Sequence, residues 1–253
     1  MKRDARPVLA VGWDVGGWCG KKQGVAVATW GEGRPAWRGH PDSFSVKRLE
    51  EAGGSLAAFI RIAWQDLPDD VLERYQVVLA IDAPLSFPKA FVDFLKDKEV
   101  EHPDTGKFIN NRLAFRDCDR VIAENFKSPL SASFDKLGNP ATVAVFYARK
   151  WSKAHGLALL PFQQDTPAQS CIIEVYPALA KDRKTKTCVP PFDHWIPSTV
   201  EPGTDEADAC ICALMALAFR SSSPECLPAL EEAPGSKDFG AEGWIYCSPR
   251  SSK

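Results

Sequence analysis

Several features that mark common classes of protein are missing from this chain of 253 residues. Its eight cysteines include no CxxC pair, so we expect reduced, mostly buried thiols rather than a zinc site or a disulfide framework. The four histidines are scattered, and His102 and His194 stand alone in polar or proline-rich segments, where histidines are usually surface residues. Metal binding through histidine or cysteine is therefore not indicated.

The chain also lacks an excess of charge and a long hydrophobic run. Its 31 lysines and arginines against 33 acids give a formal net charge of -2, so binding to nucleic acid would need a local basic patch. The apolar stretch after the basic start MKRDARP is broken by Gly12 and Asp14, too early for a signal peptide or a membrane span. We therefore expect a cytoplasmic protein with no membrane partner.

Hydrophobic patterning predicts an α/β fold in a single domain spanning residues 1–253. Apolar runs bounded by glycine and proline predict strands at 8–14, 23–30, 35–40, 76–84, 171–177 and 243–246. Helical spacing predicts helices at 49–64, 141–156 and 204–219. This order favours a mixed sheet flanked by helices. Residues 88–140, charged and broken by proline and glycine, are expected to form an insertion or lid, and residues 248–253 a flexible tail.

Three of the predicted buried strands carry an acidic residue: Asp14, Asp82 and Glu174. Aspartate is unfavourable in a strand, and a buried glutamate is costly unless it is paired or bound to metal. Ligand sites in open α/β sheets lie outside the strand ends, where side chains of neighbouring strands converge. The three carboxylates are therefore expected to form one site.

The last predicted helix adds two further acids. Asp208 shares a helical stripe with Ile211 and Met215, so it is expected to face the core, and Asp205 lies on the same face. Four or five carboxylates around one point favour Mg²⁺ or Mn²⁺. Such ions activate water and stabilise the leaving oxygen when a phosphodiester is hydrolysed.

All of these acids except Asp208 also have a structural explanation. The two strand-end aspartates precede glycine or proline, as turn residues do. Asp205 lies in a first helical turn, where the helix dipole alone favours acids. Glu174 has Lys181 or Lys184 as an alternative partner in a salt bridge.

The motifs GWDVGG, AIDAPLSFP, RDCDR, IIEVYPALA, DEADACICALMALA and EGWIYCSP follow one another in this order. Together they resemble a family of bacterial and archaeal predicted RNase H-like nucleases, long catalogued as domain of unknown function four-two-nine. The resemblance extends from Gly12 to Pro249 and is weakest in the insertion and between Lys181 and Thr204. It implies an RNase H-like fold, related at superfamily level to Holliday-junction resolvases, with an acidic metal-binding cluster.

The resemblance assigns the catalytic acids by motif as Asp14, Asp82, Glu174 and Asp208. It implies a metal-dependent nuclease in which Asp14 and Asp82 share the Mg²⁺ or Mn²⁺ ions and Asp208 completes the shell, with help from Asp205. Glu174 would bind metal or orient the attacking water. The expected partner is DNA or RNA, and a homodimer is the assembly that the resolvase analogy suggests.

Candidate substrate contacts come from the insertion. The RDCDR motif places Arg116 and Arg120 one helical turn apart, which favours two guanidinium groups facing phosphates, with Arg112 extending the patch. A solvated, self-paired run of charges is the alternative. Trp13, Trp18 and Phe115 are aromatic candidates for stacking on a base or for packing in the core.

Two other functions stay open from the sequence. A non-catalytic nucleic-acid or nucleotide-binding module fits the slightly negative charge, but the complete set of acids argues against it. The DxGG pattern at 14–17 resembles the first phosphate loop of actin-like and sugar-kinase-like ATP-dependent phosphotransferases. Those proteins bind the nucleotide between two domains, for which 253 residues leave little room.

Overall fold

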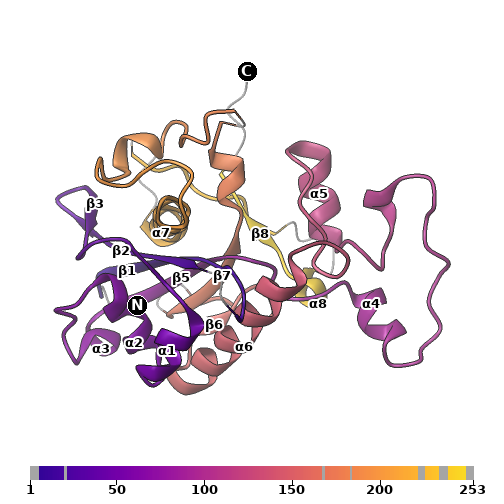
Figure 1. Ribbon diagram of the computed structural model, residues 1–253, viewed down its shortest axis with the longest axis horizontal. Helices are drawn as coiled ribbons and strands as arrows, with labels where there is room; N and C mark the ends of the chain where they lie inside the picture. The colour runs from indigo at the N-terminus through magenta and orange to yellow at the C-terminus, as the bar shows by residue number, and fades with distance from the viewer. Residues whose placement is uncertain are drawn as a thin grey trace.

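The computed structural model describes residues 6–19, 22–166, 169–182, 184–221, 226–233 and 239–248. Its centre is a mixed sheet with the strand order β3-β2-β1-β5-β7-β6, in which β4 also pairs with β2 and β8 with β7. Helices cover both faces of this sheet (Figure 1): α7 lies on one face, and α1, α2, α3 and α6 lie on the other. The predicted α/β architecture with a mixed sheet flanked by helices is confirmed.

The strands are β1 Val8–Asp14, β2 Gln23–Gly31, β3 Arg34–Trp37, β4 Asp42–Phe44, β5 Gln76–Asp82, β6 Ala158–Leu159, β7 Cys171–Val175 and β8 Ile245–Tyr246. β1 pairs antiparallel with β2 and parallel with β5, and β5 pairs parallel with β7. The carboxyl ends of β1, β5 and β7 therefore meet at one edge of the sheet. The outer edge of β7 is shared by β6 near its start and β8 near its end.

The helices are α1 Val46–Glu51, α2 Leu56–Ala63, α3 Val71–Arg74, α4 Lys89–Phe94, α5 Asp117–Asn125, α6 Gly138–His155, α7 Asp205–Ser221 and α8 Phe239–Glu242. Short 3₁₀ turns occur at Phe108–Asn110, Pro177–Ala180 and Asp193–Trp195. Among the residues described, no helix combines the length and hydrophobicity needed to cross a bilayer.

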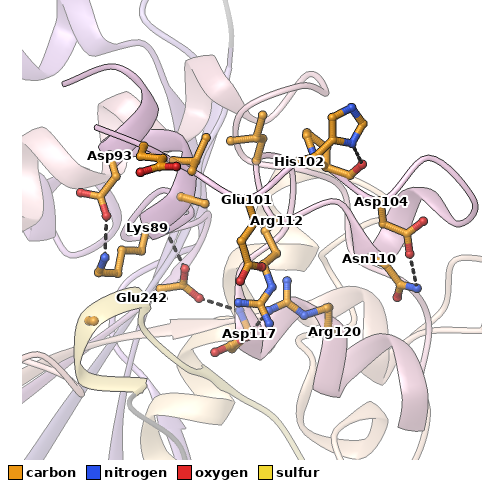
Figure 2. A pocket seen from close by; sticks show the side chains of 16 residues that line it. Lys89, Asp93, Glu101, His102, Asp104, Asn110, Arg112, Asp117, Arg120 and Glu242 are labelled. Atoms are coloured by element: carbon orange, nitrogen blue, oxygen red, sulfur yellow. Dashed lines mark hydrogen bonds and ion pairs between the residues drawn. The ribbon is translucent and has the colours of Figure 1, made fainter. Parts of the chain in front are cut away.

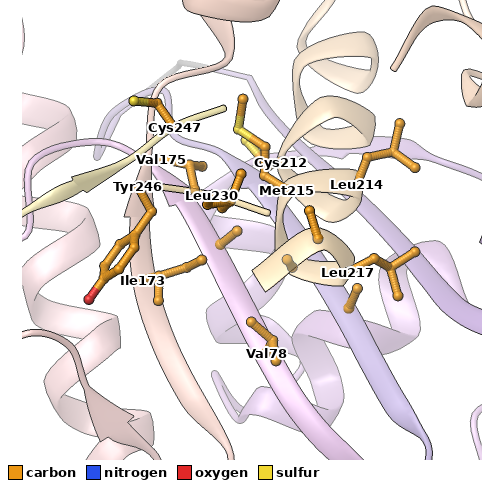
Figure 3. Packing of buried hydrophobic residues seen from close by; sticks show 14 of the residues in the cluster. Val78, Ile173, Val175, Cys212, Leu214, Met215, Leu217, Leu230, Tyr246 and Cys247 are labelled. Atoms are coloured by element: carbon orange, nitrogen blue, oxygen red, sulfur yellow. The ribbon is translucent and has the colours of Figure 1, made fainter. Parts of the chain in front are cut away.

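The core lies on both faces of the sheet because residues alternate between them along each strand. Val78 and Ile173 pack under Met215 of α7 on one face (Figure 3). On the other face Trp13 packs against Phe59 and Trp151, with ring centroids 5.1 and 5.5 Å away. Trp13 is thus a packing residue of the core. All eight cysteines are free, in agreement with the predicted reduced thiols.

The predicted helix at 49–64 is two helices in the structure. Gly53 and Gly54 have positive φ angles of 91° and 61° and end α1, and the side chain of Ser55 caps α2 by accepting a bond from the amide of Ala58. The insertion at 88–140 contains α4, a 3₁₀ turn and α5, and includes the start of α6. Apart from Ser248, the predicted tail lies outside the described residues.

Candidate metal centre

Two aspartates end neighbouring parallel strands side by side. Asp14 is the last residue of β1 and Asp82 the last residue of β5, and the two are direct partners in the register of this pair. Side chains at paired positions of adjacent strands point to the same face. The two apolar runs therefore deliver two carboxylates to one point at the edge of the sheet.

The third carboxylate comes from α7, which packs closely on β1 and β2. A Cβ atom added to Gly12 would lie 2.0 Å from the carbonyl oxygen of Ala209, and one added to Gly24 would lie 1.9 Å from that of Asp205. The two glycines let the helix backbone rest directly on the strands. As a result, Asp208 reaches the strand ends, and Asp14, Asp82 and Asp208 each present an oxygen within 4.8 Å of the others.

The electrostatics of this group favour a cation. Burial, followed by the charges of Asp82, Asp208 and Asp205, raises the pKa of Asp14 well above its ordinary value. Burial and then Asp208 raise the pKa of Asp82 to about 8, although Lys181 acts in the opposite direction. Like charges brought together away from water hold protons unless positive charge replaces them. The positive charge that the chain places near Asp14, Asp82 and Asp208 is therefore too small to compensate the three carboxylates.

Lys181 is the cation that the chain does supply. Its Nζ lies 2.6 Å from both Oδ1 and Oδ2 of Asp208, and the two side chains are 13% and 19% exposed. The sequence had offered Lys181 as a partner for Glu174. The structure instead places it on the helix carboxylate.

Glu174 lies on β7 beside the group without joining it. Its register partner on β5 is Ile81, directly before Asp82, and its charge contributes to the raised pKa of Asp82. Both of its oxygens accept hydrogen bonds from Arg116, at 2.6 and 2.8 Å, and Oε2 also accepts one from the amide of Leu85 at 2.9 Å. Arg116 is therefore the partner that makes a buried glutamate tolerable here.

Arg116 ties the insertion to the sheet. Besides Glu174, it donates to both oxygens of Asp119, at 2.9 and 3.1 Å, and to the Ser86 hydroxyl at 3.3 Å. These bonds use all five N–H donors of a guanidinium group. The side chain is 1% exposed, so it lies in the interior rather than on a surface where a phosphate would reach it.

The other two candidate arginines line a separate pocket of about 520 Å³ between α4, the segment 99–113, α5 and α8 (Figure 2). Arg120 pairs with Asp117 and donates to the carbonyl of Phe115 at 2.9 Å, as the self-paired alternative describes. Arg112 is exposed and, within the described part of the chain, has no ion-pair partner. Contact of these arginines with substrate stays a prediction.

Asp205, the remaining predicted ligand, is the first residue of α7 and lies outside the group of three. Burial and the negative charges of the neighbouring Glu206 and Asp208 raise the pKa of Asp205, so it shares the electrostatic environment of the group.

Sequence reasoning did not assign functions to Asp119 and Glu242. Both belong to motifs noted in the sequence, RDCDR and EGWIYCSP, but the spacing alone gave no partner for either.

Comparison of the chain with protein-family models, with curated proteins and with solved structures finds no match.

Proposed function

We propose that the protein is a divalent-metal-dependent phosphodiesterase, a nuclease acting on DNA or RNA, whose metal is held by Asp14, Asp82 and Asp208. The supporting observation is the convergence of three carboxylates from β1, β5 and α7 within 4.8 Å of one another. The resemblance of the sequence motifs to RNase H-like nucleases adds the reaction and the class of substrate. The RNase H-like topology itself is part of this proposal.

The residues of the group suit Mg²⁺ or Mn²⁺. All three side chains offer carboxylate oxygen, the ligand that hard divalent ions prefer. The raised pKa values of Asp14 and Asp82 indicate a deficit of positive charge, which a divalent ion would remedy. Buried carboxylates without such compensation carry a large desolvation cost.

Each residue has a distinct task in this proposal. A bound divalent ion would supply polarisation of the phosphodiester and activation of water. Asp14 and Asp82, fixed at strand ends, set the positions of two ligand oxygens. Asp208 contributes the third ligand oxygen from α7. Glu174, held in place by Arg116, adds a fixed negative charge next to Asp82.

The proposal is tested first by titrating Mn²⁺ into the metal-free protein by calorimetry, which requires no substrate. We expect saturable binding that Asp82→Asn and Asp208→Asn each weaken at least about tenfold, or about 1.4 kcal/mol. Asp69→Asn is the matched control, because this carboxylate is 98% exposed. Equal binding by the wild type and both site variants would refute the metal centre.

Cleavage is then measured with Mn²⁺ on linear and branched DNA and on RNA. Turnover by the wild type and its loss in Asp82→Asn are expected. Metal binding without cleavage of any of these polymers would favour the non-catalytic binding module instead.

A further inference from the structure

The ammonium group of Lys181 sits where a cation would sit on Asp208. It is 2.6 Å from each carboxylate oxygen, a symmetric contact that uses both of them. Most surface lysines pair loosely and remain solvated. This one is 13% exposed and pairs with one of the three carboxylates that converge within 4.8 Å of one another.

The backbone around Lys181 is held in place. Lys181 forms an antiparallel bridge with Cys188, and the amide of Val189 donates to the carbonyl of Ala180 at 2.9 Å. In the turn between them, the carboxylate of Asp182 accepts bonds from two backbone amides at 2.9 Å. The side chain therefore extends toward Asp208 from a fixed base.

The total charge of the three carboxylates and Lys181 limits how many divalent ions the group can bind. One divalent ion and one ammonium group balance the three carboxylates of Asp14, Asp82 and Asp208. Two divalent ions together with the ammonium group would leave an excess of positive charge until a phosphate arrived. Two-metal phosphodiesterases place their ions about 3.5–4 Å apart, so a lysine on one ligand competes directly with the second ion.

We propose that Lys181 replaces a second metal ion: the free protein binds one divalent ion, and the ammonium group of Lys181 occupies the other cation position at Asp208. This inference rests on the proposed metal centre and deepens it. Asp208 is then shared between a resident lysine and the metal. Removing the lysine opens a second ion site without adding any new ligand.

The experiment measures the stoichiometry of Mn²⁺ binding by calorimetry, with electron paramagnetic resonance to detect spin coupling between neighbouring ions. We expect one Mn²⁺ per chain in the wild type, and a second, spin-coupled Mn²⁺ in Lys181→Met. Lys181→Arg retains the positive charge and is expected to bind one ion. Lys184→Met, which removes an exposed lysine nearby, serves as the matched control.

Two results would overturn the inference: two coupled ions in the wild type, or only one ion in Lys181→Met. Lys181→Gln provides a second neutral variant should Lys181→Met fail to fold, as judged by thermal unfolding. The failure of the metal centre itself looks different, because neither the wild type nor Lys181→Met would then bind Mn²⁺. Both readouts are independent of nuclease activity.

Discussion

Gly12 of β1 lies directly against the backbone of Ala209 in α7. A methyl group at residue 12 would meet the carbonyl oxygen of Ala209 at 2.0 Å and the amide nitrogen of Ala213 at 2.4 Å. Backbone atoms cannot move aside as the end of a flexible side chain can. The distance between α7 and the sheet, and with it the position of Asp208, therefore depends on the absence of a side chain at residue 12.

Gly12→Ala is accordingly expected to destabilise the protein by about 1–3 kcal/mol, the usual cost of overpacking a core, and to weaken Mn²⁺ binding by displacing Asp208. Chemical denaturation and calorimetry measure the two effects. The matched control is Gly31→Ala on β2, where the nearest atom to an added Cβ is that of Ala36 at 3.6 Å. A Gly12→Ala variant as stable as the wild type would contradict the close packing of α7 on β1.

The metal-free protein is expected to lose stability as the pH rises from about 4 to about 8. Burial and Asp208 raise the pKa of Asp82 from 3.8 to about 8 in the folded chain. In this window the unfolded chain releases a proton that the folded chain keeps, so the free energy of unfolding falls, by at most about 1.4 kcal/mol per pH unit from this group. Asp82→Asn removes this titration and should give a flatter profile.

Urea denaturation at several pH values, with and without saturating Mn²⁺, measures this dependence. If the proposed centre binds Mn²⁺ through ionised carboxylates, the stabilising effect of Mn²⁺ should grow with pH in the wild type. Parallel profiles for the wild type and Asp82→Asn would show that Asp82 titrates normally.

Arg116→Met is expected to destabilise the fold by about 3–5 kcal/mol, because it leaves the buried carboxylates of Glu174 and Asp119 without their counter-charge. Arg112→Met is the control. Arg112 is exposed, so its replacement should change the free energy of unfolding by no more than about 0.5 kcal/mol. Similar denaturation midpoints for the two variants would show that the buried network contributes little.

Arg112 provides the clearest test of substrate contact in the pocket of Figure 2. If it neutralises one phosphate, Arg112→Ala should weaken binding to all DNA sequences alike and reduce the slope of log affinity against log salt by about 1. Fluorescence anisotropy at several salt concentrations measures the slope. The control is Arg34→Ala on β3, at the opposite end of the molecule in Figure 1; an equal effect of both would exclude a specific contact.

The parts of the fold that were predictable are those with a local signal. The strands ending at Asp14 and Asp82 are recognisable because each is an apolar run that ends in a carboxylate. The helical spacing of Asp208 predicted that its side chain faces the core. These three residues do converge in the structure. Their convergence follows from parallel strand pairing and from helix packing, both of which hydrophobic periodicity anticipates.

The partners of the charged residues could not be predicted in the same way. Lys181 and Asp208 are 27 positions apart, and Arg116 and Glu174 are 58 apart. No spacing rule relates such pairs. From the sequence, Lys181 was therefore considered as a partner of Glu174, and Arg116 was predicted to contact a phosphate. Which cation compensates which carboxylate depends on how the insertion and the segment after β7 pack on the sheet, and this is a property of the tertiary structure.

The carboxylate of Glu242, late in the chain, accepts bonds from the backbone amides of Lys89 and Asp117, each at 2.7 Å, at the starts of α4 and α5. During translation, both helices are synthesised more than a hundred residues before Glu242 is added to the chain. β8, which pairs with the end of β7 beside Glu174, is likewise synthesised only after β7. Co-translational folding can therefore build the sheet up to β7 first, whereas the insertion acquires the contacts of Glu242 only after β7 has been synthesised.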